Sequence, residues 1–289
     1  MIRTGAFGCR PFSNHLLSHW SGVPHQEETK MNNHGNRIAI VTGVSRPNGI
    51  GASICRKLAR KGHDIFFTHY SQYDISTGYK DATETFPVIF KKELQEMGVI
   101  AEEMELDLSE PNASEDLIAQ VKKMTGELAI LVNNATHCVE VDHDELSAEI
   151  IDQHCAVNVR GTCMLSVTFA KQLKKQQAEG RIINFVSGQD KSPQPGNLAY
   201  ITTKGAISAF TTSLSTELAL YNITVNAVDP GPTDSGWMDD ELQTFLKPKF
   251  PTGRIGTPDD AARLVGFLAS YEARWITGQI IHSDGGFRD

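Results

Sequence analysis

The residues best suited to chemistry are Tyr200 and Lys204, which stand four positions apart. On a helix this spacing places two side chains one turn apart on the same face. A free tyrosine has a pKa of about 10. A neighbouring ammonium favours the phenolate, so such a pair could take a proton from a substrate oxygen or return it. Average residue usage gives about an even chance of one such pair in a chain of this length, so the pair needs supporting residues.

Two further polar residues, Ser187 and Asn158, supply that support. Ser187 follows the apolar run 181–186 and stands thirteen positions before Tyr200. Doubly wound sheets bind their ligands at the carboxyl ends of the strands, which is where this serine falls. Asn158 lies between Val157 and Val159 inside a predicted long helix, where a buried amide needs a reason. We therefore predict that Asn158, Ser187, Tyr200 and Lys204 form a catalytic set.

A glycine-rich loop at 42–51 lies between the first predicted strand and the first predicted helix. Glycine lets the chain turn tightly and approach a pyrophosphate, and the helix N-terminus offers unpaired N–H groups and the positive end of the helix dipole. An ordinary strand-to-helix turn is the alternative, because such turns commonly contain glycine. The strand–glycine–helix order favours a dinucleotide coenzyme.

The exit of the second strand bears on the choice between NAD and NADP. A site for NAD usually places Asp or Glu about 20 residues beyond the glycines, to hold the ribose 2′-hydroxyl. Here the strand ends in Thr68, His69 and Tyr70, without a carboxylate. Arg46 in the glycine loop could pair with a 2′-phosphate, although a solvated loop charge is the alternative. Together these features predict NADP(H). Asp107, at the end of the third predicted strand, is placed to bind the adenine amino group.

From residue 37 onward, short apolar runs alternate with amphipathic stretches. The expected strands cover 38–42, 64–70, 102–108, 128–133, 181–186, 223–228 and 279–282, and the expected helices about 50–61, 87–97, 111–124, 156–177, 199–220 and 258–270. Alternating elements of these lengths need crossover connections, which give a mostly parallel sheet with helices on both faces. The prediction is one α/β domain over 37–289, a doubly wound (Rossmann) fold with a seven-stranded parallel sheet.

The composition excludes several other classes of protein. The chain is 40% hydrophobic and 21% charged, and it has no run of 18 apolar residues. A transmembrane protein is therefore not expected. A formal charge of -8 disfavours nucleic-acid binding, which needs a basic surface. Five scattered cysteines suit a reducing compartment, so we expect a cytoplasmic protein. We expect no metal site, because neither C-x-x-C nor H-E-x-x-H occurs.

Residues 1–36 differ from the rest of the chain. They contain four histidines, four glycines and two prolines without sustained apolar periodicity, and polar residues interrupt any secretory core. We expect a disordered N-terminal extension ahead of the domain at 37–289. Docking of Leu16, Leu17 and Trp20 on a neighbouring subunit is the alternative. Met31 lies just before the first strand, so a leader or a misplaced start is a further interpretation.

From about residue 37 to its C-terminus, the chain resembles the short-chain dehydrogenase/reductase family. The resemblance rests on motifs that follow the family's order and spacing. They are the glycine loop at 42–51, Asp107, Asn133-Asn134-Ala135, Asn158, Ser187, the Tyr200/Lys204 pair and Pro230-Gly231. Within the family the chain looks most like bacterial reductases labelled 3-oxoacyl-carrier-protein reductases, a label that says little about the substrate.

The resemblance implies an NADP(H)-dependent oxidoreductase that reduces a carbonyl to an alcohol, or the reverse. Tyr200 would be the acid/base, Lys204 would also bind the nicotinamide ribose, Ser187 would polarise the substrate oxygen, and Asn158 would hold a water on the proton path. The chemistry on carbon belongs to the coenzyme. The expected coenzyme-binding residues are Gly43, Ser45, Arg46, Gly49, Ile50, Gly51, Thr68, Asp107, Leu108, Asn134, Ala135, Tyr200, Lys204, Pro230, Gly231 and Thr233.

The chain departs from the family pattern in two places. Its glycine loop is two residues longer than the usual T-G-x-x-x-G-x-G, which leaves the alignment of Arg46 open. Enoyl reductases of the family have similar loops, but they place six residues between tyrosine and lysine. That tyrosine would fall at Asn197, so enoyl reduction is disfavoured. Thr136 replaces the glycine of the usual Asn-Asn-Ala-Gly.

The substrate side is less constrained by the sequence. Apolar residues at about 232–252 could form a lid over the substrate, or could pack on the core or on a partner subunit. The C-terminal strand and tail of the family commonly build subunit contacts, so a homotetramer or homodimer is expected. The substrate would be a small carbonyl or alcohol, with carrier-protein attachment left open. A non-catalytic NADP(H) sensor of the same fold is the alternative function, but a sensor would not need Tyr200.

Overall fold

The computed structural model describes residues 37–188 and 191–288. Within them, seven strands form one sheet in the order β3-β2-β1-β4-β5-β6-β7, and all neighbouring strands are parallel. The strands are β1 (Arg37–Val41), β2 (Asp64–His69), β3 (Ala101–Glu105), β4 (Glu127–Asn133), β5 (Gly180–Phe185), β6 (Ile223–Asp229) and β7 (Ile280–His282). The predicted fold class is confirmed. The predicted extension at 1–36 lies outside the described residues.

Successive side chains of the central strands enter two apolar layers. In β1, Ala39 and Val41 belong to one layer, and Ile38 and Ile40 belong to the other. Neighbouring side chains of a strand point to opposite faces, so a strand covered on both sides must be apolar throughout. β5 and β6 are buried at every position. This double burial explains why these strands are continuous apolar runs in the sequence.

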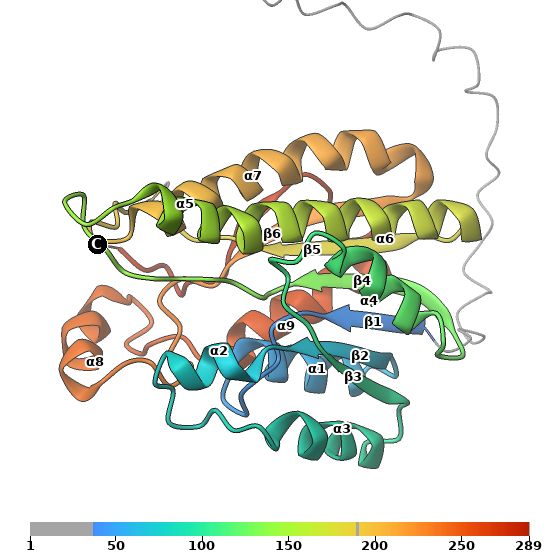
Figure 1. Cartoon of the computed structure of the whole chain (residues 1–289), viewed down its shortest axis with the longest axis horizontal. Helices are drawn as coiled ribbons and strands as arrows, with labels where there is room; N and C mark the ends of the chain where they lie inside the picture. Colours follow the sequence, from blue (N-terminus) through green and yellow to red (C-terminus); the bar gives the residue numbers. More distant parts are fainter. Residues whose placement is uncertain (1–36, 189–190, 289) are drawn as a thin grey trace, which may run out of the picture. The chain divides into compact units, whose positions relative to one another are not determined.

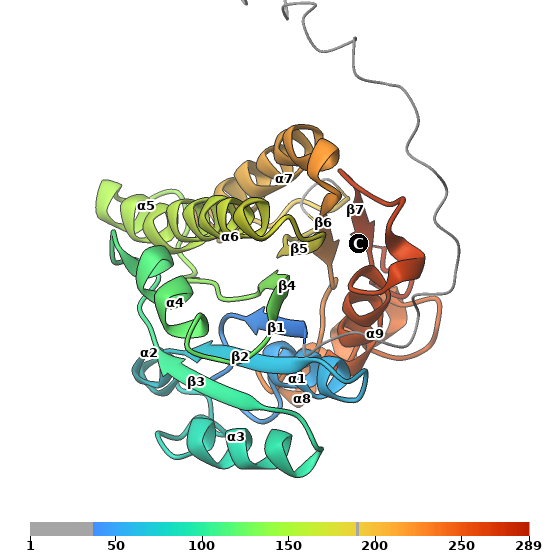
Figure 2. The ribbon, with the colours of Figure 1, turned by 90° about the vertical axis from the view of Figure 1, so that its right-hand side faces the viewer.

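Helices cover both faces of the sheet. One layer contains residues of α1 (Ile50–Ala59), α3 (Phe86–Glu96) and α9 (Pro258–Leu268). The other contains residues of α4 (Ala113–Val121), α6 (Thr162–Gln176) and α7 (Leu198–Leu218). Figure 2 shows α6 and α7 on one side of the sheet and α1 and α9 on the other. No helix in the described part of the chain is both long and apolar enough to cross a membrane.

The structure differs from the sequence prediction at several elements, among them α8 (Asp240–Leu246), which is not one of the predicted helices. Helix α2 (Ser71–Ser76) occupies a stretch whose polar residues show no apolar period. The long helix begins earlier than expected, as α5 (Ala148–His154), and passes through a π-helical segment (Cys155–Gly161) into α6. Ser147 starts α5 by accepting the N–H of Ile150. Strand β3 ends at Glu105, so Asp107 lies in the following turn, where its Oδ1 accepts the N–H of Ser109 at 2.7 Å.

The connections at one end of the sheet are the ones that matter for function. Figure 1 shows α2, α5 and α8 (Asp240–Leu246) gathered at the end where the arrows of β1 and β4 point. Helix α8 belongs to a small apolar cluster of its own, which consists of Met238, Leu242, Leu246, Phe250, Ile255 and Phe287. The carboxyl ends of the strands are therefore surrounded by loops and short helices rather than by the main core.

Candidate active site

A cleft of about 1810 Å³ lies at the carboxyl ends of the strands. Its walls come mainly from the loops that follow β1, β2, β3, β4, β5 and β6 and from the first turns of α7. Sixteen of the eighteen site residues predicted from the sequence line it: Gly43, Ser45, Arg46, Gly49, Ile50, Thr68, Asp107, Leu108, Asn134, Ala135, Ser187, Tyr200, Lys204, Pro230, Gly231 and Thr233. The cleft walls do not include Asn158 or Gly51.

The glycine loop is packed closely enough to require glycine at two positions. Gly43 has φ +74°, and a Cβ there would lie 2.7 Å from the Cα of Ala135. A Cβ on Gly51 would lie 2.6 Å from the carbonyl oxygen of Gly43. The N-terminus of α1 carries no side-chain cap and no acidic residue in its first turn, so it can offer N–H groups to an anion. This arrangement fits the pyrophosphate of a dinucleotide.

The two extra residues of the glycine loop are anchored from outside it. The N–H of Asn48 donates to Asp81 Oδ2 at 3.2 Å, and Arg56 Nη1 donates to the carbonyl of Pro47 at 3.1 Å. Asp81 belongs to residues 71–85, which we call the strap; it contains α2 and follows β2. The lengthened loop and the strap therefore stabilise each other.

Arg46 is buried within this assembly, with 8% of its surface exposed. Its Nη1 donates to the carbonyl of Ser235 at 2.8 Å and to Asp81 Oδ1 at 3.0 Å. Its Nε lies 3.3 Å from Asp74 Oδ1, and its guanidinium carbon lies 3.5 Å from the centroid of the Tyr79 ring. The alternative that Arg46 is a solvated loop charge is therefore wrong. The strap residues around it carry no family motif and were not predicted as site residues.

Three of the four residues predicted to be catalytic, Ser187, Tyr200 and Lys204, converge on the floor of the cleft. Tyr200, in the first turn of α7, is hydrogen-bonded to Ser187 at the exit of β5. Ser187 Oγ also accepts a hydrogen bond from Gln194 Nε2 at 2.9 Å. Lys204 lies one turn further along α7, with its Nζ 5.3 Å from the centroid of the Tyr200 ring. That Nζ donates to the carbonyl of Phe185 at 3.0 Å. The carboxyl end of β5 and the start of α7 thus bring these groups together.

Burial dominates the acidity of both groups. It raises the pKa of Tyr200, with Cys138 and Asp229 adding to the increase and the hydrogen bond to Ser187 opposing it. Burial also lowers the pKa of Lys204 to about 8. The sequence analysis expected the Lys204 ammonium to lower the pKa of Tyr200, and burial acts in the opposite direction as the largest influence on that pKa. At neutral pH the phenol keeps its proton, which suits an acid, and most of Lys204 stays charged.

Asn158 lies behind the cleft floor rather than on it. It sits in the π-helical segment, and its Oδ1 accepts hydrogen bonds from His137 N at 2.7 Å and Thr136 Oγ1 at 3.2 Å. Its Nδ2 donates to His137 O at 2.8 Å and to Thr203 Oγ1 at 3.0 Å. Both polar atoms of the amide are therefore used by the protein. This geometry supports a role in holding the loop at 136–138, whereas a bound water was the expectation.

The strap also reaches that loop through Tyr73. The Tyr73 hydroxyl donates to the carbonyl of Cys138 at 3.2 Å and accepts its N–H at 2.9 Å. Cys138 Sγ in turn contacts the side-chain amide of Asn197, at the N-terminal end of α7, at 3.5 and 3.6 Å. Tyr73, His137 and Cys138 all line the cleft. The sequence analysis did not select them, because no spacing relates α2 to the loop after β4.

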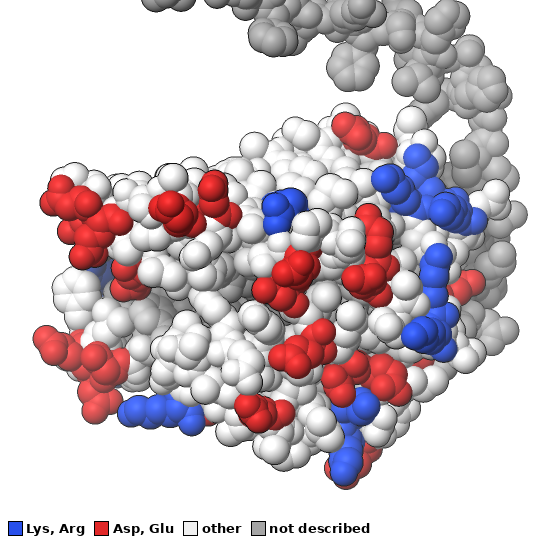
Figure 3. Space-filling model, in the orientation of Figure 1, with Lys and Arg blue, Asp and Glu red and all other residues white. Residues whose placement is uncertain are grey.

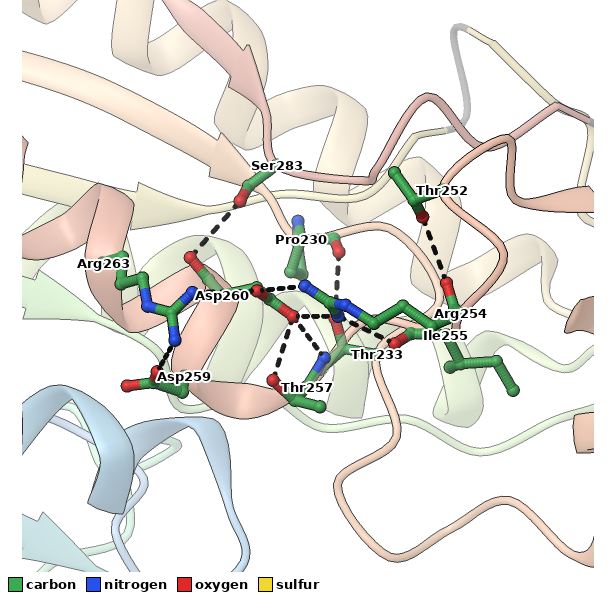
Figure 4. A network of polar contacts seen from close by, with 10 residues as sticks. All are labelled: Pro230, Thr233, Thr252, Arg254, Ile255, Thr257, Asp259, Asp260, Arg263 and Ser283. Carbon is green, nitrogen blue, oxygen red and sulfur yellow. Dashed lines mark hydrogen bonds and ion pairs between the residues drawn. The ribbon is translucent and has the colours of Figure 1, made fainter.

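The loop after β6 forms the remaining wall. Thr233 Oγ1 donates to the carbonyl of Pro230 at 2.9 Å, which fixes the turn that contains Gly231. Figure 4 shows this turn beside the N-terminus of α9, where the Asp260 carboxylate accepts hydrogen bonds from Thr257 and from Arg254. The Arg254 guanidinium holds the pKa of Asp260 well below its usual range. This wall is therefore fixed by its own polar network.

A second polar cluster lies at the end of β7. His282 Nδ1 and Asp229 Oδ2 are 2.7 Å apart, and Asp229 Oδ1 accepts the N–H of Gly231 at 3.0 Å. Asp284 is paired with the ammonium of Lys191. Asp229, His282 and Asp284 are close enough together to hold a metal ion. Because Lys191 already supplies a cation to Asp284, we assign the cluster to holding the loops around the cleft.

Comparison with known proteins agrees with this geometry. A family model described as enoyl-(acyl carrier protein) reductase matches residues 43–288. The protein named uncharacterized oxidoreductase YjdA of Bacillus subtilis (strain 168) is 52% identical over 258 residues, which are 89% of this chain and 99% of that protein. The 3-oxoacyl-(acyl-carrier-protein) reductase FabG of Aquifex aeolicus (strain VF5) is 32% identical over 86% of this chain and 96% of its own length.

Among solved structures, acetoin dehydrogenase from Enterobacter cloacae is similar, with a TM-score of 0.74 and 31% identity over 87% of this chain and 96% of that one. The matched region contains residues 43–51 of the glycine loop together with Ser187, Tyr200 and Lys204. The resemblance predicted from the sequence is thereby confirmed: the chain belongs to the short-chain dehydrogenase/reductase family of oxidoreductases.

Proposed function

We propose that this protein is an NADP(H)-dependent oxidoreductase that reduces a carbonyl to an alcohol, or catalyses the reverse, with Tyr200 as the acid/base. The observation that carries the proposal is the meeting of Tyr200, Ser187 and Lys204 on the floor of a cleft whose other end is the glycine loop. A sensor would need the glycine loop but not this proton-transferring group. The arrangement therefore favours a catalyst over the non-catalytic alternative.

In the proposed reaction, the bound nicotinamide supplies or accepts the hydride at carbon. The chain's own residues handle the oxygen. Ser187 donates a hydrogen bond to the substrate oxygen and so orients it toward Tyr200. In the reduction, Tyr200 transfers its phenolic proton to that oxygen, because the raised pKa keeps the phenol protonated at neutral pH. The Lys204 ammonium stabilises the phenolate that this transfer leaves.

The preference for NADP(H) is the finer part of the proposal. Thr68, His69 and Tyr70 at the exit of β2 line the cleft and offer no carboxylate to a ribose 2′-hydroxyl. Asp74 lies further on in the strap, where it is already engaged by Arg46 and Ser45. Among the relatives, the chain is similar to 3-oxoacyl-(acyl-carrier-protein) reductases. These features support a site that receives a 2′-phosphate.

The expected substrate is a small, free carbonyl or alcohol compound. Acidic residues gather at the left-hand end of the face in Figure 3, on both sides of a hollow. Segment 136–159 contains six carboxylates and segment 229–246 contains five, and neither contains Lys or Arg. These segments contribute Glu140, Asp152 and Asp239 to the cleft walls. Like charges repel, so this end is poorly suited to an acidic carrier protein.

Enoyl reduction is less well supported, although the matching family model bears that description. In the enoyl reductases that the sequence resembles, the tyrosine would stand at position 197. Here Asn197 occupies that position, and its amide contacts Cys138 Sγ. An amide cannot act as a proton donor of comparable acidity. Ketone and aldehyde reduction through Tyr200 is therefore the better proposal.

The segment at about 232–252 is proposed as a lid. Met238, Leu242 and Leu246 line the cleft and belong to the small cluster around α8, outside the two main apolar layers. Because the apolar contacts of this cluster are made within it rather than with either main layer, α8 could move to admit substrate while the turn at 230–235 stays fixed. Trp237, which is 46% exposed, stands at the same edge. Apolar side chains at the mouth would favour a substrate with an uncharged body.

We also propose assembly as a homotetramer or homodimer in the cytoplasm. Trp275 is 94% exposed and lies near the edge strand β7, where Ile280 is also exposed. Exposed apolar groups along an open sheet edge favour pairing with another copy. The described cysteines are all free, which suits a reducing compartment. Sedimentation of the purified chain tests the assembly.

The proposed function is tested by following NADPH consumption with a panel of small ketones, aldehydes, diketones and enones. We expect turnover with one or more carbonyl compounds, reversal with the matching alcohol and NADP⁺, and little activity with enones. Turnover confined to carbon–carbon double bonds would refute the proposed reaction. Equal or better efficiency with NADH would refute the coenzyme preference alone.

A further inference from the structure

The donors of Arg46 are committed to the protein itself. Nη1 bonds Ser235 O and Asp81, Nε faces Asp74, and the Tyr79 ring covers one face of the guanidinium. The Arg46 guanidinium is thus shared between the carboxylates of Asp74 and Asp81, so these three side chains together carry a net negative charge. A 2′-phosphate carries close to two negative charges and would meet these carboxylates at short range. Arg46 is therefore poorly placed to be the main partner of such a phosphate.

Lys80 lies next to Tyr79 and Asp81 in the chain, but unlike Arg46 it is exposed and, within the described part of the chain, is not paired with a carboxylate. It is exposed and lines the cleft. Among residues 37–188 and 191–288, no carboxylate lies within ion-pair distance of its ammonium. Its two neighbours in the chain, Tyr79 and Asp81, are both held by Arg46. The backbone on either side of Lys80 is thereby fixed at the wall of the cleft, while the side chain stays available.

The strap that carries Lys80 meets the glycine loop through the contacts of Arg46 with Tyr79 and Asp81, at the end of the cleft that the coenzyme ribose would occupy. The N–H of Val44 donates to Thr68 O at 2.8 Å, and the N–H of Tyr70 donates to Ser45 Oγ at 3.1 Å. The exit of β2 and the strap thus meet the glycine loop at residues 44–46. An NAD site holds the 2′-hydroxyl at this junction.

The other described cations of the cleft lie elsewhere or are engaged. Lys204 is bonded to Phe185 O, and Lys191 is paired with Asp284. Arg160 donates to Ser109 O, in the turn after β3 that contains Asp107. Arg288 follows Phe287, which packs with the cluster around α8. Lys80 is the cation best placed for a phosphate at the junction of β2, the strap and the glycine loop.

We propose that Lys80 binds the 2′-phosphate of NADP(H), and that Arg46 is a positioning residue that holds the strap on either side of it. This inference rests on the proposed function, since it concerns the same coenzyme site. It differs from the assignment made on sequence grounds, which gave the phosphate to Arg46. A lysine ammonium on an exposed stem suits the role, because it needs no fixed fork geometry to pair with a phosphate.

The test measures binding of two nucleotides that differ only in the 2′-phosphate, namely 2′,5′-ADP and 5′-AMP, by calorimetry on the full chain. We expect the wild type to prefer 2′,5′-ADP. In Lys80→Ala that preference should fall about tenfold, through loss of one charge-assisted contact, while 5′-AMP binding stays unchanged. Lys80→Arg should retain most of the preference. Lys80→Glu should abolish it.

Two controls accompany these variants. Lys92→Ala removes another exposed lysine, on α3, and should leave both nucleotides unaffected. Arg46→Ala should weaken both nucleotides and lower the melting temperature, because it releases the strap and the glycine loop together. Melting curves of all variants confirm that Lys80→Ala is folded. The preference for 2′,5′-ADP should also weaken with added salt in the wild type, and less so in Lys80→Ala.

The outcomes separate this inference from the function on which it rests. A wild type that binds both nucleotides equally refutes the NADP(H) preference itself. A wild type that prefers 2′,5′-ADP, with Lys80→Ala behaving identically, overturns the role of Lys80 and leaves the coenzyme preference standing. Loss of the preference in Arg160→Ala instead would move the phosphate site toward Asp107 and would likewise overturn the inference.

Discussion

Replacing Tyr200 by Phe removes one oxygen atom from the floor of the cleft and keeps the aromatic ring. The folded chain loses the hydrogen bond between Tyr200 and Ser187, which costs about 1 kcal/mol of the free energy of unfolding. The much larger effect should fall on the rate. Phenylalanine has no proton to give to the substrate oxygen, which is the role proposed for the Tyr200 phenol.

The expected loss follows from the chemistry of proton transfer. A positioned general acid contributes about 10²- to 10⁴-fold, which corresponds to about 3–5 kcal/mol in the activation free energy. Because the pKa of Tyr200 is raised by burial, the wild-type phenol is fully protonated at neutral pH and contributes all of this to the reduction. NADPH should bind the Tyr200→Phe protein within a few-fold of wild type, since the glycine loop is untouched.

The assay follows NADPH absorbance with the best carbonyl substrate, and coenzyme binding is measured separately by nicotinamide fluorescence. Tyr271→Phe is a matched control, since Tyr271 is 52% exposed and lies far along the chain in the turn after α9. This control should match the wild type in both measurements. If Tyr200→Phe keeps more than a tenth of the wild-type rate, Tyr200 is not the proton donor and the proposed mechanism is refuted.

Three further predictions concern the residues around this site. Lys204→Met should stabilise the protein at pH 7 by up to about 3 kcal/mol, the equivalent of a fall in pKa from 10.5 to about 8. The folded wild type holds the Lys204 proton less tightly than the unfolded chain does, so the stability advantage of Lys204→Met should fade as pH rises from about 8 to 10.5. A difference in melting temperature that does not change with pH would contradict this prediction. Gly51→Ala should lower both stability and coenzyme affinity, because its Cβ would lie 2.6 Å from Gly43 O. Gly49→Ala should have a much smaller effect, because the nearest contact of its Cβ is at 3.2 Å. Equal effects of the two variants in thermal melts would show that close packing of Gly51 is not the cause. Asp260→Asn should lower the free energy of unfolding by about 1 kcal/mol at pH 7, because it weakens the cap of α9. Because Arg254 depresses the pKa of Asp260, this difference from the wild type should shrink as pH falls below about 4. A difference that persists at low pH in acid-melting curves would show that the charge of the carboxylate is not its cause.

The length of the glycine loop is visible in the sequence, but the contacts that hold the loop are visible only in the folded chain. The sequence shows the two additional residues, but it cannot show what binds them. In the fold, Asp81 reaches the N–H of Asn48 from the strap, and Arg56 reaches Pro47 O from α1. Arg46 was selected for its charge, and its environment of Asp74, Asp81 and Tyr79 became visible only in the folded chain.

The sequence by itself determined the order of the seven strands and the main helices along the chain, the family, and the positions of Tyr200, Lys204, Ser187 and the glycine loop. These features are local, since they depend on apolar periodicity, on glycine where the backbone needs it and on spacing within one helix or turn. The tertiary structure alone decided that Asn158 faces the loop at 136–138, that burial is the largest influence on the pKa of Tyr200, and that the strap closes around Arg46. Those outcomes depend on contacts between segments that are far apart in the chain. Burial and long-range hydrogen bonding are properties of the packed molecule, and no pattern of neighbouring residues contains them.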